Sequence, residues 1–172
     1  APDHVVYTDK YSKEDLKLSS ELSAACTLFY NIGRAVPWFL VFTDFFHEIP
    51  SNFLKKFIKL YEKVYYHSIR NGCLCSDDYY FEVQKIQKAF IKDYCQKNNV
   101  SYVWKMFESL IVLHGAFSIN SSTGKEQKIQ LSYHPDDLLS AYATEPSFFV
   151  KNIRPYTCNV LVKNGDYKLL KN

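Results

Sequence analysis

The sequence predicts an α+β fold that is predominantly α-helical, with about five helices packed around a buried central helix at residues 102–113 and two small β-hairpins in the C-terminal third. Three observations support this class. Apolar residues recur with a helical period before residue 100, the segment 102–113 is apolar almost all round, and the period changes to two after Gly115. A chain of 172 residues, 47% of them hydrophobic, can bury one sizeable core, so we expect a single domain, 1–172.

The central helix is predicted from its missing polar face. Within 102–113 only Lys105, Glu108 and Ser109 are polar, and at 3.6 residues per turn these three share one narrow stripe. A helix that is hydrophobic all round is a buried helix, and this one is too short to span a bilayer. Gly115 is the expected stop.

The first helices are predicted from capping and apolar spacing. Residues 12–15 form a capping-box-like start, and the apolar stripe that follows ends at Gly33. The run 38–46 is almost wholly apolar, so helix and buried strand both fit its pattern. We favour a helix, because strands buried on both faces usually belong to parallel sheets, and no other segment here is typical of one.

Three further helices have start or stop signals. Pro50 opens the clearest amphipathic helix, with Gly72 as its stop, and residues 76–78 suit the positive end of the next one. The segment 134–143 is expected to form a short helix that Pro146 ends.

Two hairpins are expected after Gly115. Residues 116–120 and 128–133 are interpreted as a loose hairpin, and residues 158–162 and 167–170 as a tighter one. Asn164-Gly165 between the second pair is the strongest short hairpin signal, because both residues tolerate positive φ.

The order of elements in 52–133 resembles that of a winged-helix module: two helices, the central helix and then a hairpin. In DNA-binding members of that class the helix before the wing enters the major groove and presents polar side chains. Here that helix offers only Lys105, so the resemblance implies a protein-binding or structural variant.

The cysteine count favours an intracellular, reducing compartment. Five cysteines cannot all pair within one chain and lack the density of a disulfide scaffold. Sequons at Asn99 and Asn120 leave secretion as an alternative. No transmembrane segment is expected.

Metal and catalytic motifs are weak. His67, Cys73 and Cys75, with Cys95 or Asp77, supply zinc-type ligands, but Cys-x-Cys is tighter than the usual finger spacing. We expect reduced cysteines in a turn, and no metal or cofactor.

A second pattern imitates the carboxylate pair and lysine of metal-dependent nucleases: Asp136, Asp166 and Lys168. Asp136 is better explained as a cap residue and Asp166 as a turn residue. Without a nucleophile elbow, a phosphate loop or a His-Glu-x-x-His motif, we expect no enzyme, although a hydrolase site assembled by the fold stays open.

Lysines form rows on two consecutive predicted helices, and Tyr66 completes this candidate surface. If the helices lie side by side, the rows would form one basic surface for a phosphate backbone, although arginine, the preferred phosphate partner, is absent from them. The lysines are Lys55, Lys59 and Lys63 on the first helix, and Lys85, Lys88 and Lys92 on the second.

The leading functional hypothesis is a non-enzymatic protein–protein interaction domain of adaptor or regulatory type. Tyr and Phe together number 27, so some aromatics must be exposed, and exposed aromatics are enriched in protein interfaces. The expected partner is another protein or a second copy of the chain. Nucleic-acid binding through the lysine rows is the alternative, and the net charge of +3 is too mild to decide for it.

Overall fold

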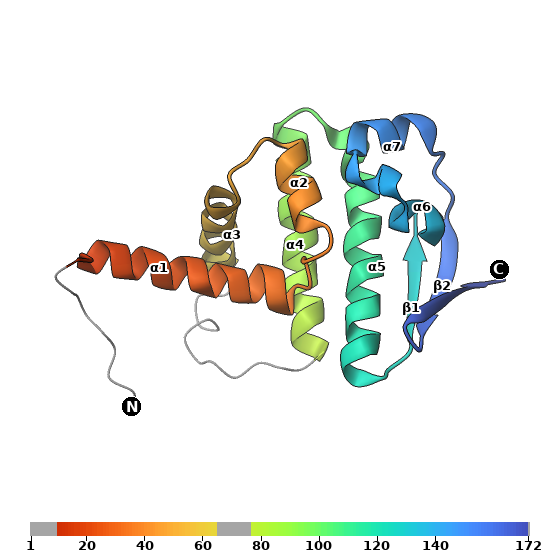
Figure 1. Ribbon diagram of the computed structural model, residues 1–172, viewed down its shortest axis with the longest axis horizontal. Coiled ribbons are helices and arrows are strands. Elements are labelled where there is room, and N and C mark those ends of the chain that lie inside the picture. Colours follow the sequence, from red (N-terminus) through yellow and green to blue (C-terminus); the bar gives the residue numbers. More distant parts are fainter. Residues whose placement is uncertain (1–9, 65–76, 172) are drawn as a thin grey trace.

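A computed structural model describes residues 10–64 and 77–171 and has the predicted class: it is α+β and predominantly α, with seven α-helices and one three-stranded antiparallel sheet among these residues. Helix α5 lies between the sheet on one side and the other long helices on the other (Figure 1). The α-helices are α1 Lys13–Ala25, α2 Phe39–Phe45, α3 Pro50–Val64, α4 Asp77–Lys97, α5 Trp104–Thr123, α6 Pro135–Leu139 and α7 Pro146–Asn152, and the strands are β1 Gln127–Leu131, β2 Cys158–Lys163 and β3 Asp166–Leu170.

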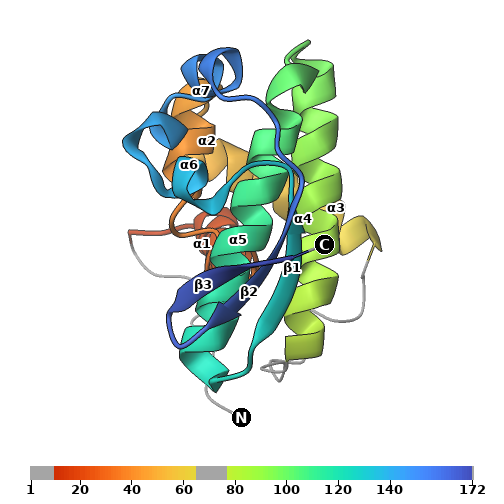
Figure 2. The same ribbon diagram turned by 90° about the vertical axis from the view of Figure 1, so that its right-hand side faces the viewer.

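The central helix is buried as predicted, but it is longer than expected. It begins with a 3₁₀ turn at Ser101–Val103 and continues as α5 to Thr123. Its side chains meet α2 at one side, where the Phe107 and Phe42 rings are 5.0 Å apart. The sheet covers another side (Figure 2). Ten residues of α5 are buried, so the helix is the centre of the core.

Gly115 was expected to stop this helix, and that prediction was wrong. Gly115 lies in mid-helix, where an added Cβ would be 1.6 Å from the hydroxyl oxygen of Tyr80 on α4. Its role is therefore close helix–helix approach. The left-handed C-cap residue is Gly124, with φ of 71°.

The first expected hairpin is also wrong. Residues 116–120 are helical, and β1 pairs with β2 instead of with them. Ala116, Ile119 and Asn120 are buried at helical spacing, i, i+3 and i+4. The short segment 116–120, with apolar residues at 116, 117 and 119, is compatible with either period, and its place at the end of a buried helix makes it helical. Because β1 finds its partner far along the chain, no wing follows α5 and the winged-helix layout does not hold.

The second hairpin is confirmed. Strands β2 and β3 pair antiparallel with Lys163 opposite Asp166, and Asn164 and Gly165 between them have φ of 54° and 75°. The sheet order is β1-β2-β3. Val160 and Val162 of β2 are fully buried, so one face of the sheet belongs to the core.

Helix α1 starts at the predicted capping box, in which Ser12 and Asp15 bond reciprocally. The helix then changes to a π-helix at Cys26–Ile32, which the sequence did not indicate. Buried Gln87 of α4 donates from Nε2 to the carbonyl oxygen of Phe29 at 2.9 Å. This side chain pairs a carbonyl within the irregular turn.

The expected helix in 38–46 is confirmed as α2, and its aromatic rings enter a cluster with α3 and α4. The Phe42 and Phe53 rings lie 5.2 Å apart, and Phe53 lies 5.1 Å from Phe90. Pro146, expected to end a helix, instead occupies the first position of α7, where a missing N–H costs nothing. Among the helices of residues 10–64 and 77–171, none has the length and hydrophobicity required to cross a membrane.

We predict that Gly115→Ala destabilises the protein by about 1–3 kcal/mol, because the methyl group overpacks the contact with Tyr80. An ordinary helical glycine would give the opposite sign, since alanine is the better helix former by about 1 kcal/mol. Urea unfolding measures the change. In a Tyr80→Phe background the loss should shrink, and a Gly115→Ala variant more stable than the wild type would contradict the close approach.

Candidate interaction site

The site that the fold offers is a small apolar pocket at the junction of α2, α5 and α6. Its volume is about 180 Å³, which is below the range of pockets that bind drug-sized ligands. These elements come together in Figure 2. We call it the α2–α6 pocket; its lining residues are Pro37, Trp38, Val41, Leu110, His114, Leu138, Leu139, Ser140, Ala143 and Thr144.

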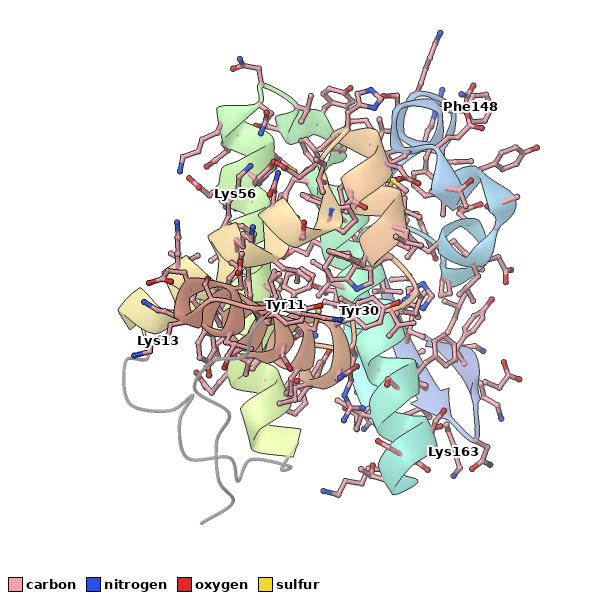
Figure 3. The ribbon with its side chains drawn as sticks, turned by 60° about the vertical axis from the view of Figure 1, so that its left-hand side comes forward. Tyr11, Lys13, Tyr30, Lys56, Phe148 and Lys163 are labelled. Atoms are coloured by element: carbon pink, nitrogen blue, oxygen red, sulfur yellow. The ribbon has the colours of Figure 1, made fainter. Side chains whose placement is uncertain are left out.

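Exposed apolar side chains belong to the segments that form this pocket. Leu40 is 57% exposed on α2, and Leu139, which also lines the pocket, is 47% exposed at the end of α6. Tyr142 follows in the next turn and is 56% exposed; its ring lies 5.4 Å from that of Phe148 on α7, the residue labelled in Figure 3. We use the name rim for five exposed side chains: Val36, Leu40, Leu139, Tyr142 and Phe148.

Besides the hydroxyls of Ser140 and Thr144, the pocket wall contains the indole N–H of Trp38 and the imidazole of His114. The indole Nε1 of Trp38 is buried and has no hydrogen-bond partner among the residues that the structure describes. His114 is partly buried, and desolvation lowers its pKa to about 4, so its imidazole is neutral at physiological pH. The pocket is therefore an uncharged, mostly apolar concavity.

The lysine rows do not meet on one surface. On α4, Phe90 contacts Phe57 of α3, whereas Lys88 lies about 200° round the helix and lines a polar groove with Gln130 of β1. The α4 row is thus on the side away from α3. Lys55 and Lys59 remain on α3; the side chain of Lys63 and all of Tyr66 lie outside the described residues.

Several lysines, both within and outside the rows, form ion pairs. Lys85 pairs with Glu82 at 2.6 Å and Lys56 with Glu48 at 2.5 Å. Lys56 and Lys163 lie on opposite sides of the view in Figure 3. Exposed pairs of this kind contribute little stability but reduce the local positive charge.

The metal and nuclease patterns gain no support from the described residues. His67, Cys73 and Cys75 lie outside them, and Cys95 is buried with its pKa raised by desolvation to about 12. Within residues 10–64 and 77–171 no group of three His, Cys, Asp or Glu side chains is placed to hold a metal ion.

Asp166 adjoins the hairpin turn as expected, but Asp136 was expected to be a helix cap and that interpretation was wrong. Asp136 lies in the first turn of α6, where the neighbouring His134 is the N-cap, and it accepts a hydrogen bond from the Tyr167 hydroxyl. Asp166 follows the hairpin turn. The Asp136 carboxylate is therefore accounted for by its hydrogen bond with Tyr167, and the Asp166 carboxylate by its hydrogen bond with the Tyr167 N–H beside the turn.

The pocket residues were missed by the sequence reasoning. The continuous apolar run that contains Trp38 and Val41 gave no sign of which side chains would be exposed, and His114 sits within a helix that was interpreted as core alone. Their proximity to α6 depends on long-range packing, for which a single sequence carries no local signal.

No protein-family model, curated protein or solved structure matches this chain.

We predict that His114 makes the protein less stable as pH falls from about 6.5 towards 4. In that window the unfolded chain has bound a proton at His114 and the folded chain has not, so the free energy of unfolding decreases by at most about 1.4 kcal/mol per pH unit. Urea unfolding at several pH values should show a shallower slope for His114→Gln. His47→Asn, at an exposed histidine, is the control; an unchanged slope in His114→Gln would contradict a neutral buried imidazole.

Proposed function

We propose that this chain is a non-enzymatic protein-interaction domain that binds its partner through the α2–α6 pocket and the rim. The observation that carries the proposal is the association of a concave apolar pocket with several large, exposed apolar side chains. Interfaces are centred on such pockets, which accept an anchoring side chain, and are surrounded by contacts that exclude water.

Solvent exposure and position together favour the rim over the other exposed apolar residues as the binding surface. Leu40, Leu139 and Tyr142 are each about half exposed and belong to segments that wall one pocket. Exposed apolar residues that occur singly need no explanation, whereas grouped ones indicate an interaction site. The aromatic pair Tyr142 and Phe148 adds the residue types that interfaces favour.

We predict that Leu40→Gln with Leu139→Gln removes partner binding without unfolding the protein, because both side chains are already largely in water. The measurement is affinity capture with cross-linking from cell extract, with sedimentation velocity to detect self-association. Circular dichroism should show unchanged unfolding within about 1 kcal/mol.

The matched control is Ile49→Gln with Leu169→Gln, two exposed apolar side chains away from the pocket walls. This variant should keep the partner. Loss of the partner in the control alone, or a monomeric protein that retains nothing specific, would refute the proposal.

Nucleic-acid binding remains the second candidate function. The proposed binding surface is now limited to the lysines of α4, Lys85, Lys88 and Lys92. Lys88 shares a polar groove with Gln130, Ser132 and Thr157, whose hydrogen-bonding groups suit a phosphate backbone. Glu108 in the same groove opposes it.

For this candidate, reversal of Lys85, Lys88 and Lys92 to Glu should abolish binding of a labelled oligonucleotide, and binding to the wild type should weaken steeply with salt. Reversal of Lys55 and Lys59 on α3 is the control and should matter much less. Salt-independent binding, or equal losses in both variants, would exclude recognition by the α4 row.

A further inference from the structure

The segments that carry the pocket contain no lysine or arginine. One of them is 106–124, which supplies Leu110 and His114 to the wall. The same is true of stretches 35–54 and 129–150, although the whole chain has 21 such residues and a net charge of +3. These stretches include α2, α6 and the turn that leads into α7, so they supply most of the pocket wall. All lining residues therefore come from segments without lysine or arginine, and the wall itself carries no positive charge.

Three acidic residues adjoin lining positions of the pocket. Asp44 is one helical turn after Val41 on α2, Asp137 directly precedes Leu138, and Glu145 directly follows Thr144. Asp44 and Glu145 are exposed, and Asp137 is half-buried.

The other acids of these stretches are engaged elsewhere. Glu48 pairs with Lys56, and Asp136 accepts from Tyr167. Among the described residues no ion pair involves Asp44, Asp137 or Glu145. Their charges remain available to a partner.

Size and chemistry limit what the pocket accepts. A volume of about 180 Å³ suits one large aliphatic or aromatic side chain, not a cofactor. The wall carries no cation that would pair with an anionic group, because His114 is neutral and the other lining residues are uncharged.

From this charge complementarity we infer that the occupant is a peptide segment of another protein that inserts one apolar side chain into the α2–α6 pocket and flanks it with lysine or arginine. The inference rests on the proposed function and names the partner class for the same site. The apolar anchor supplies the buried contact, and the basic flanks meet Asp44, Asp137 and Glu145, giving register and on-rate.

The test uses two synthetic peptides, capped at both ends, each with one leucine; two lysines flank it on either side in one peptide, and two glutamates in the other. At low ionic strength the lysine peptide should shift the amide resonances of Val41, Leu110, His114 and Leu138, and the glutamate peptide should bind at least about tenfold more weakly. Replacement of the leucine by alanine should remove the shifts. Equal or tighter binding of the glutamate peptide, or no shift at the pocket with either peptide, would overturn the inference.

A variant with neutral side chains, Asp44→Asn, Asp137→Asn and Glu145→Gln, should lose the preference for the lysine peptide and should capture less of the cellular partner. The control variant neutralises three acids elsewhere, Glu14→Gln, Asp93→Asn and Asp166→Asn. It should keep the preference for the lysine peptide and should capture the cellular partner as well as the wild type does.

The two proposals fail separately. If the Leu40 and Leu139 substitutions abolish capture while the neutral variant captures normally, the interaction site stands and the basic partner is excluded. If the Leu40 and Leu139 variant and the neutral variant both still capture the partner, both proposals fail.

Discussion

The architecture depends on one constraint: the polar stripe of α5 is narrow, so most of the surface of this helix must be covered. Aromatic side chains of α2 cover one side, α4 lies alongside, and the sheet covers another. Elements from both halves of the chain must pack against α5, and this requirement determines their positions in the fold. The position of α6 beside the α2 segment, and hence the α2–α6 pocket, follows from this enclosure.

Close packing around α5 requires that the polar groups enclosed there have space and hydrogen-bond partners. Tyr80 can reach the backbone of α5 only because Gly115 has no side chain, and its hydroxyl accepts from Gln84. Ser109 accepts from the Ser132 N–H at 3.1 Å, which ties the end of β1 to the helix. A small number of side-chain contacts thus joins α4, α5 and the sheet. Backbone hydrogen bonds within each helix and within the sheet do not connect these elements to one another.

Local signals in the sequence predicted the elements better than their contacts. The capping box, the Asn164-Gly165 turn and the apolar stripes have local physical causes, and each was confirmed. Gly115 failed because glycine serves both helix stops and close approach, and only Tyr80, 35 residues earlier, decides between them. The pocket failed for the same reason: His114 and Leu139 become neighbours only when α6 packs on α5.

Helix α5 is a buried scaffold, and the proposed interaction surface is built on shorter elements at its side. Native-state hydrogen exchange tests this separation most directly. We expect the amides of residues 110–119 to exchange only through global unfolding, and those of α6 and α7 to exchange through smaller, local openings. Slower exchange in α6 and α7 than in α5 would contradict the claim that α5 is the element around which the protein is built.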